Sequence, residues 1–228
     1  MLRFAHYYTP GPDTVLAEAA STWLGRDHEN RGSSMIVTKT LGNERFAQLT
    51  QAPFHYGFHG TLKPPFRLHD ATSKKLLCEE LDHFCNQRSS FILEGLEIGW
   101  IGKFLCLRPV KSSEKMNKLA WDAVRQFDSF REDMSFTELE RRRTQGLTPQ
   151  QDALLLQWGY PYVMDEFRFH LTLSSKIEDA QERTMLEEEA RRHFSSDLLQ
   201  EIPVDGMSLF VETDGQPMTL LRFFPFES

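Results

Sequence analysis

The sequence has few cysteines and no pattern that would use them as cross-links or as metal ligands. The three that it holds, Cys78, Cys85 and Cys106, are odd in number and form no Cys-x-x-Cys pair. Small disulfide frameworks and zinc ribbons need paired cysteines at short, regular spacing. We therefore expect three reduced thiols in the core.

An excess of positive charge is also missing. Lys and Arg total 26 against 33 Asp and Glu, which gives a formal net charge of −7. A protein that binds long nucleic acid normally presents a basic face to the phosphates. The balance argues against a general binder of long duplex nucleic acid, but it leaves room for a local cationic pocket that holds one phosphate.

Long apolar runs are absent as well. No stretch reaches the roughly 18 apolar residues that a membrane helix needs, and the segment Met1–His6 lacks the apolar centre of a signal peptide. We expect a cytoplasmic protein with no membrane partner. We also expect a monomer.

The composition of the sequence is typical of a globular protein that folds without disulfide bonds or structural metal ions. It has 228 residues, of which 40% are hydrophobic and 12% aromatic, with 18 Phe. A chain of this length can bury a substantial core as one large domain or two small lobes. No low-complexity stretch or flexible linker divides residues 1–228.

Hydrophobic periodicity and turn residues predict alternating strands and helices. The strand patterns cover residues 3–9, 54–68 (broken at Pro64-Pro65), 90–98, 101–109, 166–175, 207–212 and 218–224. The helical patterns cover residues 14–24, 72–87, 114–130 and 149–158, and a further helix begins at Asp179. Residues 25–50 show no clear pattern. Because hairpins dominate the strand connections, we expect an α+β fold with antiparallel sheets.

One short pattern occurs twice. Phe58–Leu62 and Phe169–Leu173 both read Phe-His-x-Thr-Leu, and their histidines lie 111 residues apart. Side chains alternate between the two faces of a strand, so His59 and Thr61 share one face, and His170 and Thr172 do the same in the second copy. The apolar residues of each copy occupy the opposite face. We therefore expect two polar rows that face water or a ligand.

Two imidazoles suit the cleavage of a phosphodiester. The reaction needs a base that takes a proton from water and an acid that protonates the leaving alkoxide, and histidine can do either at neutral pH. The hydroxyls of Thr61 and Thr172 can bind the phosphate oxygens. None of these steps requires a metal ion or an organic cofactor, so we expect neither.

The paired His-x-Thr motifs resemble those of the 2H phosphoesterase superfamily, which includes the bacterial RNA 2′,5′-ligase/cyclic phosphodiesterase proteins. The longer string Tyr56–Phe66 and the segments Arg3–Tyr8 and Ser21–Gly25 are similar to one branch, which is associated with phosphonate-degradation operons. The resemblance implies one bilobal unit over residues 1–228. Two pseudo-symmetric lobes, each with an antiparallel sheet flanked by helices, would surround a central cleft and carry one motif each.

The resemblance also assigns roles to the motif residues. It implies that His59 and His170 are catalytic and that Thr61 and Thr172 bind phosphate, without telling which histidine is the acid. Some members carry Ala where this sequence has Gly60, and we expect the glycine to have little functional effect beyond a softer strand.

Other polar residues near the motifs have a functional and a structural interpretation. Tyr7, Lys63 and Arg168 are candidate substrate contacts, although Lys63 precedes the proline pair and a solvated lysine fits equally well. His55 lies too far from His59 along a strand to share a metal ion with it. His193 lies on a predicted helix outside both motifs. We interpret the charged run Glu138–Arg143 as a solvated helix face.

The hypothesis that joins these observations is a metal-independent cyclic phosphodiesterase. Its substrate would be a nucleoside 2′,3′-cyclic phosphate or a cyclic ribosyl phosphate from phosphonate metabolism, and the acidic net charge favours such a small substrate over a long RNA. Two alternatives remain open. One is a non-catalytic module that binds RNA ends or nucleotides in the same cleft. The other is an RNA 2′,5′-ligase that runs the reverse chemistry.

Overall fold

The computed structural model describes residues 2–144, 146–195 and 199–227. Its largest feature is a seven-stranded sheet in the order β4-β5-β6-β2-β1-β8-β9, in which all neighbours pair antiparallel. The remaining strands, β3 and β7, form a separate antiparallel pair. The strand bounds are β1 Leu2–Tyr8, β2 Gly60–Phe66, β3 Phe91–Leu93, β4 Leu96–Ile101, β5 Phe104–Pro109, β6 Leu171–Thr172, β7 Ile202–Val204, β8 Gly206–Thr213 and β9 Thr219–Pro225.

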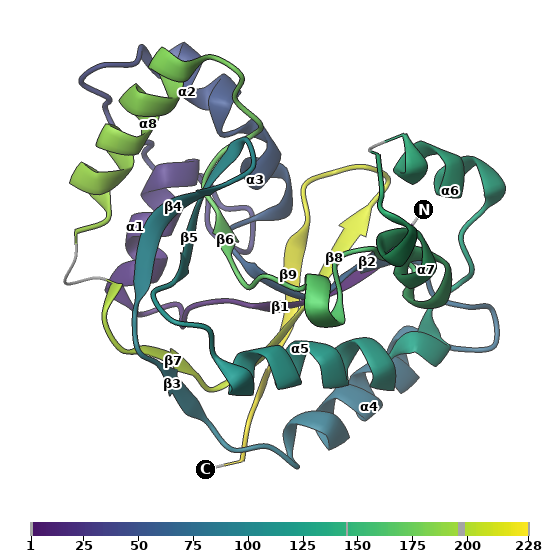
Figure 1. The fold of residues 1–228 in the computed structure, drawn as a ribbon. Coiled ribbons are helices and arrows are strands. Elements are labelled where there is room, and N and C mark those ends of the chain that lie inside the picture. Colours follow the sequence, from purple (N-terminus) through teal and green to yellow (C-terminus); the bar gives the residue numbers. More distant parts are fainter. Residues whose placement is uncertain (1, 145, 196–198, 228) are drawn as a thin grey trace.

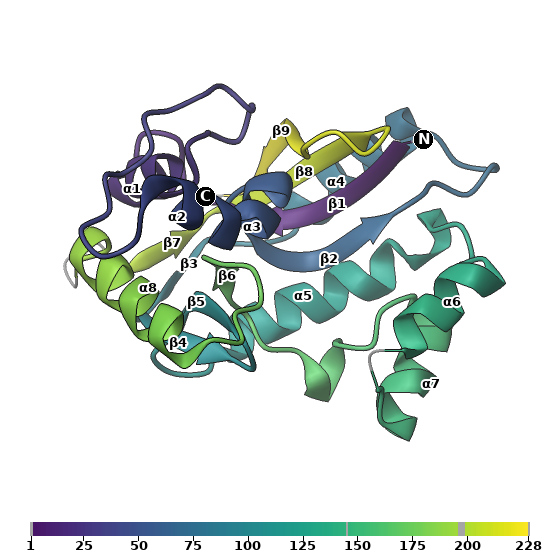
Figure 2. The ribbon, with the colours of Figure 1, turned by 90° about the horizontal axis from the view of Figure 1, so that it is seen from above.

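Helices flank this sheet, so the molecule is α+β as expected (Figure 1). α5 packs against β2, α4 against β9 and α8 against β4, and Figure 2 shows α5 running alongside β2. The helix bounds are α1 Val15–Leu24, α2 Asn43–Leu49, α3 Gln51–Tyr56, α4 Lys74–Cys85, α5 Glu114–Gln126, α6 Phe136–Arg143, α7 Pro149–Trp158 and α8 Ala180–His193. Two short 3₁₀ turns, Asp128–Phe130 and Met164–Glu166, complete the set.

The large sheet has two halves that meet at the repeated motif. One half consists of β4, β5 and β6, and the other of β2, β1, β8 and β9. A single residue pair, Gly60 with Leu171, joins them between β2 and β6. Each of these glycine and leucine positions directly follows a motif histidine. The seam between the halves therefore brings the two motifs together.

Local sequence signals explain most helix starts. Thr14, Ser73 and Asp179 each accept a hydrogen bond from the backbone of the first helical turn, as N-capping residues do. Thr148 and Gln151 form the reciprocal capping box that the sequence predicts at the start of α7. The amphipathic spacing of α5 buries Met116, Leu119, Ala120, Ala123 and Val124 against the sheet.

Three sequence predictions need correction. Residues 54–56, predicted in a strand, belong to helix α3. The strand that follows runs through Pro64-Pro65 without a break. In the segment 166–175 only Leu171–Thr172 joins a ladder. The hairpin in the 90–109 region turns at Gly102, after β4 has run to Ile101, and the unpatterned region 25–50 contains α2.

The proline pair is tolerated because one edge of β2 is open there and the pairing with β1 on the other edge is irregular, so that neither Pro64 nor Pro65 has a partner on β1. β6 pairs with β2 only at Gly60, so the backbone from Lys63 onward has no ladder partner on that side. A proline lacks the N–H that such a partner would need, and it is found in strands where that N–H has no acceptor.

In the described residues, no helix is both long and apolar enough to cross a membrane.

Candidate active site

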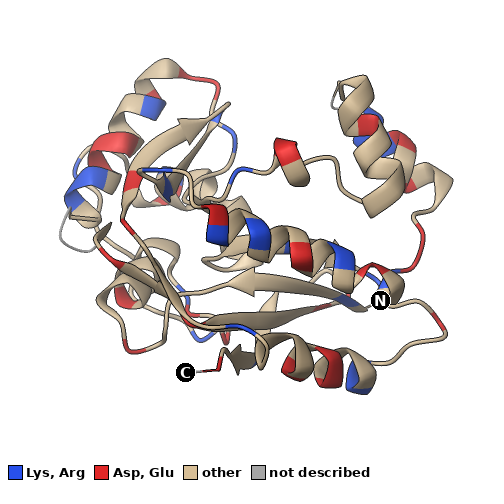
Figure 3. Cartoon of the chain, turned by 60° about the horizontal axis from the view of Figure 1, so that its bottom comes forward, with Lys and Arg blue, Asp and Glu red and all other residues tan. Residues whose placement is uncertain are grey.

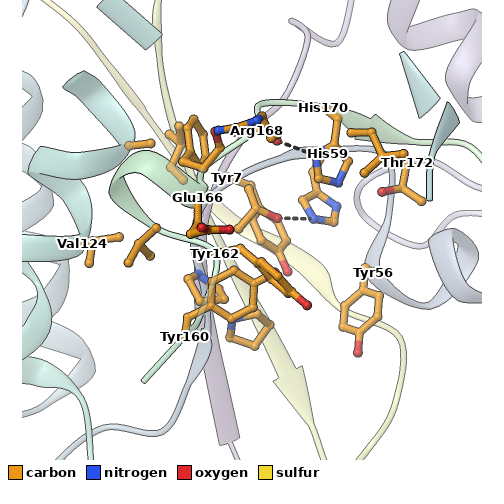
Figure 4. A pocket seen from close by; sticks show the side chains of 18 of the residues that line it. Tyr7, Tyr56, His59, Val124, Tyr160, Tyr162, Glu166, Arg168, His170 and Thr172 are labelled. Carbon is orange, nitrogen blue, oxygen red and sulfur yellow. Dashed lines mark hydrogen bonds between the residues drawn. The ribbon is translucent and has the colours of Figure 1, made fainter. Parts of the chain in front are cut away.

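A cavity of about 910 Å³ opens beside the seam of the sheet (Figure 4). Its wall draws on β1, β2, the β4–β5 turn, α5, α6 and the segment 160–172. All four motif residues line it, namely His59, Thr61, His170 and Thr172. The volume lies within the roughly 300–1,000 Å³ range of small-molecule sites.

His59 is held in one orientation from three sides. Its Nδ1 lies 2.8 Å from the carbonyl oxygen of Gly57, and its Nε2 lies 3.1 Å from the hydroxyl of Thr61. The Tyr7 ring stacks on the imidazole with 3.6 Å between centroids. The chain reaches this position through Gly57, whose φ of 76° is one that few residues besides glycine adopt easily.

His170 is held in the same way. Its Nδ1 lies 2.6 Å from the carbonyl oxygen of Arg168, two residues earlier, just as Gly57 precedes His59 by two. The Phe104 ring, from the start of β5, lies 5.3 Å from the imidazole centroid. The two motifs thus share side-chain geometry as well as sequence.

This geometry fixes which ring nitrogen is free. A carbonyl oxygen can only accept a hydrogen bond, so Nδ1 must carry the proton in both rings. In the neutral imidazoles of His59 and His170, Nε2 then has the lone pair. The hydroxyl of Thr61 can donate to the Nε2 of His59. Each histidine therefore has a basic nitrogen available to a ligand.

The strand register relates each histidine to the threonine of the other motif. Gly60 and Leu171 are antiparallel partners. Continuing this register by one residue on either side places His59 opposite Thr172 and His170 opposite Thr61. Figure 4 shows both imidazoles and Thr172 at the same end of the cavity.

Burial lowers the pKa of both histidines, by different amounts. The pKa of His59 falls to about 3, mainly because burial disfavours the charged ring, while the Gly57 carbonyl acts in the opposite direction and a charge on His170 would lower it further. The pKa of His170 is also lowered by burial, opposed by the Arg168 carbonyl. Both rings are therefore neutral at pH 7 in the free protein.

Of the three further residues predicted to contact substrate, two line the cavity and one does not. Tyr7 is buried and lines the cavity against His59. Arg168 also lines it, with its guanidinium donating to the carbonyl oxygens of Asp165 and Phe167. Lys63 does not. Its side chain is 1% exposed and its amine donates to the carbonyl oxygen of Val124, on the side of α5.

A β-bulge accounts for the position of Lys63. His6 pairs with Lys63 and Tyr7 with Thr61, so β2 holds one extra residue, Leu62, between the two pairs. A bulge of this kind breaks the alternation of faces. Thr61 and Lys63 therefore do not share a face, and the expectation that Lys63 contacts substrate is wrong.

The cavity wall also includes residues that the sequence analysis assigned elsewhere or missed. Arg141 and Arg142 lie in the run that we interpreted as a solvated helix face, yet both line the cavity. The aromatic part of the wall comes from Tyr56, Trp121, Tyr160 and Tyr162. Local patterning gives no signal for these residues, because the chain places α6 and the segment 160–172 around the site only through tertiary contacts.

The other histidines noted in the sequence have ordinary partners. His55 Nε2 lies 2.9 Å from a Glu212 carboxylate oxygen, and His193 Nε2 lies 2.7 Å from the carbonyl oxygen of Ala19. Within the described ranges, no group of three or more His, Cys, Asp or Glu side chains is arranged to hold a metal ion. Metal independence remains a prediction.

Comparison with known proteins places the chain in a family. The family described as "Protein of unknown function (DUF1045)" matches residues 61–219. The match begins inside the first motif at Thr61 and contains the second motif completely.

Two curated relatives are named ribose 1,5-bisphosphate phosphokinase PhnN. The protein from Janthinobacterium sp. (strain Marseille) is 32% identical over 232 residues, covering 99% of this chain and 51% of its own length. The protein from Laribacter hongkongensis (strain HLHK9) is 31% identical over 214 residues, covering 93% of this chain and 49% of its own length. The chain therefore spans about half the length of the curated relatives that it matches.

Solved structures show a weaker likeness. A crystal structure described as a phosphoesterase has 12% sequence identity and a TM-score of 0.47, with 100% of both chains covered. Escherichia coli LigT in complex with NADP⁺ has 12% identity and a TM-score of 0.46, with 99% of this chain and 98% of that chain covered. Likeness at these scores assigns no reaction to the chain.

Proposed function

The chain belongs to the DUF1045 family, and we propose that it hydrolyses a cyclic phosphodiester of a small phosphorylated sugar, with His59 and His170 as general base and general acid. One observation carries the proposal. The two histidines line one cavity, and each has its Nδ1 bound to the carbonyl two residues earlier, which leaves both Nε2 atoms for the substrate. An enzyme that moves two protons around one phosphate needs two such nitrogens.

We assign the base role to His59 and the acid role to His170. Burial lowers the pKa of His59 to about 3, so this ring stays neutral and acts as the base. The pKa of His170 is also lowered by burial, opposed by the Arg168 carbonyl. With the base role taken by His59, His170 is left to carry the proton and acts as the acid.

The reaction then balances as follows. His59 Nε2 takes a proton from a water molecule while the water oxygen forms a bond to phosphorus. The bond from phosphorus to one ring alkoxide breaks, and His170 gives its proton to that oxygen. The product is a phosphate monoester with a free hydroxyl. A proton then passes from His59 to His170 through solvent, which restores the starting state.

Neighbouring groups support the phosphate as charge moves onto its oxygens. The hydroxyls of Thr61 and Thr172 line the same end of the cavity. Among the described side chains, the Thr172 hydroxyl has no hydrogen-bond partner, so it can donate to a phosphate oxygen. Arg168 and Lys176 add positive charge to the cavity wall. Donors placed where charge develops stabilise the transition state.

The relatives support a phosphorylated ribose as the substrate class. Both are named for ribose 1,5-bisphosphate, and each contains a segment similar to this whole chain. Hydrolysis of a 1,2-cyclic phosphate of ribose 5-phosphate at its O2 bond gives ribose 1,5-bisphosphate. A cyclic ribosyl phosphate therefore fits the site and the names together, ahead of a nucleoside 2′,3′-cyclic phosphate.

The direct experiment follows phosphorus by ³¹P NMR. The protein is incubated with a ribose 1,2-cyclic phosphate and, separately, with a nucleoside 2′,3′-cyclic phosphate. We expect the cyclic signal to be replaced by a monoester signal, fastest with the ribose compound. An RNA with a 5′-hydroxyl, added together with an RNA that ends in a cyclic phosphate, tests for ligation. Binding without turnover, unchanged when both histidines are replaced, would indicate a non-catalytic module and contradict the proposal.

A further inference from the structure

Three consecutive arginines of α6 have different environments. Arg143 is neutralised, because its guanidinium donates to both carboxylate oxygens of Asp152, at 2.7 and 2.9 Å, and to Glu140 at 3.0 Å. Arg141 and Arg142 have no ion pair with any described residue, and both line the cavity. The unpaired members of the run are the two that face the site.

Arg142 is the more unusual of the pair. Its Nε is buried and has no hydrogen-bond partner among the described residues. Its guanidinium lies 5.8 Å from the Tyr160 ring centroid, and burial lowers its pKa. The charged groups that act on its pKa are Glu138, which pairs with Arg67 at 3.0 Å, and the cations Arg141 and Arg3. A buried donor without a partner is costly, and the described residues supply no partner for this Nε.

Arg3 places this cluster relative to the histidines. It lies on β1 four residues before Tyr7, on the same face, and both side chains line the cavity. Four residues of strand span about 13 Å at roughly 3.3 Å each. Tyr7 stacks on His59, so Arg3, which is itself paired with Glu212, marks a part of the cavity that is distinct from the catalytic pair.

The charge of the wall favours an anion at this second position. The described lining contains six basic side chains, Arg3, Lys103, Arg141, Arg142, Arg168 and Lys176, and one carboxylate, Glu166. Arg3 and Lys103 are paired with Glu212 and Glu178, so four cations of the lining have no ion pair among the described residues. Glu166 accepts a hydrogen bond from Gln151. This excess of positive charge is confined to the cavity wall. Elsewhere acidic and basic residues alternate, as along α5 (Figure 3), and the molecule as a whole carries a net negative charge.

We propose that Arg142 and Arg141 form a second anion subsite, which binds a phosphate monoester of the substrate. The inference rests on the proposed function, because it places the cyclic phosphate of the same molecule at the histidine pair. A guanidinium binds phosphate through two parallel hydrogen bonds, which would satisfy the unpartnered Nε. A nucleobase stacked on Tyr160 or Tyr162 would use the aromatic wall but would leave the guanidinium groups unpaired. The subsite therefore selects a substrate with two phosphates.

The test compares two ribose cyclic phosphates that differ only at carbon 5, one with a phosphate and one with a hydroxyl. We expect the wild-type kcat/KM to be roughly 10- to 100-fold higher for the 5-phosphate, the gain typical of hydrogen bonds to a charged group. Arg142→Gln should lower the ratio of the two values to near one. Arg142→Lys should restore part of it. Arg191→Gln removes the same charge from an exposed position on α8, outside the cavity, and should leave the ratio unchanged.

A binding measurement separates this inference from the proposed function. Isothermal titration of ribose 5-phosphate into the His59→Ala/His170→Ala double variant reports the second subsite without turnover. We expect Arg142→Gln in that background to raise Kd roughly 10- to 100-fold. If neither cyclic phosphate is hydrolysed but this binding still requires Arg142, the proposed function fails and the subsite stands. If hydrolysis occurs and Arg142→Gln lowers both kcat/KM values equally, or the wild type shows no preference, the subsite is refuted.

Discussion

The stacking of Tyr7 on His59 gives a prediction for a single side chain. The ring fixes the plane of the imidazole at 3.6 Å, whereas the tyrosine hydroxyl makes only a weak contact with the Met218 sulfur at 3.3 Å. Tyr7→Phe keeps the ring and should leave kcat within about threefold of wild type. Tyr7→Leu loses the stacking and should lower kcat roughly tenfold or more, with a smaller change in KM, because misaligned catalytic groups lose rate. Equal effects of the two changes in steady-state kinetics would contradict a positioning role.

The histidines predict the pH dependence of the reaction. The active form carries one proton between the two rings, so kcat/KM should follow a bell-shaped profile that reports the coupled pair. The protonated fraction of the acid falls as the pH rises. Because burial lowers the pKa of both rings, the descending limb of the profile should lie below pH 6.5.

His59→Ala and His170→Ala should each lower kcat roughly 10²- to 10⁴-fold, and the double variant should lose less than the product of the two single effects. A flat profile from about pH 5 to 9, with chemistry rate-limiting, would remove the mechanism.

Among individual site residues, the sequence predicts those of the repeated motif and few others. The duplicated motif identifies four cavity residues, because strand alternation keeps His and Thr on one face. The prediction that Lys63 contacts substrate fails because a bulge is a property of two paired strands and has no local signature here. Arg142 is missed because a charged helix surface looks alike whether it faces water or a cavity.

Among the elements, the junction of β2 and β6 leaves no room for a side chain at Gly60. A Cβ there would lie 2.3 Å from the Phe169 ring, so the ring would have to move, and with it the residue before His170. This corrects the expectation of little effect. Gly60→Ala should lower the free energy of unfolding by about 1–3 kcal/mol, the usual cost of overpacking, and should also lower kcat. Gly32→Ala, which has nothing within 4 Å of its Cβ, is the matched control for thermal and chemical denaturation. Equal stability of the two variants would show that the junction can relax.

Elements with caps and amphipathic spacing are predicted well, and those made by pairing are not. Helices α1, α4, α5, α7 and α8 lie where the sequence places them, since capping residues and buried faces are local signals. β6 shrinks to Leu171–Thr172 because its length depends on which strands come alongside it. Ser174 lies two residues after Thr172, beyond the ladder, and is buried, and its hydroxyl accepts a hydrogen bond from the backbone N–H of Leu105.

For the whole molecule, buried histidines predict a loss of stability in mild acid. Burial lowers the pKa of His6, His28, His59 and His170 in the folded state. The unfolded chain takes up protons near pH 6.5, so it binds more protons than the folded protein below that pH. The free energy of unfolding should therefore fall as the pH decreases below about 6.5. The lowered pKa of Glu189, about 2, contributes only below its ordinary value of 4.5.

Denaturant titrations at constant ionic strength measure this slope between pH 6.5 and 5. His6 has both ring nitrogens buried without partners, and its ring packs against Phe66 and Phe127. His6→Leu removes one titrating group and should make the slope shallower by up to about 1.4 kcal/mol per pH unit. A slope that the substitution leaves unchanged would show that His6 is not neutral in the fold.

The assembly of the molecule as a whole is only partly readable from the sequence. The antiparallel α+β class follows from hairpin signals, but the closure of the cavity by α6 and the segment 160–172 depends on contacts such as the ion pair between Arg67 and Glu138. Such contacts join residues far apart in the chain, and no local pattern marks them.

The central claim is that two imidazoles cleave a cyclic phosphate. The most direct test is the rate at which a ribose 1,2-cyclic phosphate is hydrolysed by protein treated exhaustively with EDTA, measured for the wild type and for the His59→Ala/His170→Ala double variant. The account predicts that the chelator leaves the wild-type kcat unchanged and that the double variant loses at least roughly 10²-fold. Turnover that survives loss of both histidines, or that EDTA abolishes and added Zn²⁺ or Mn²⁺ restores, would contradict it.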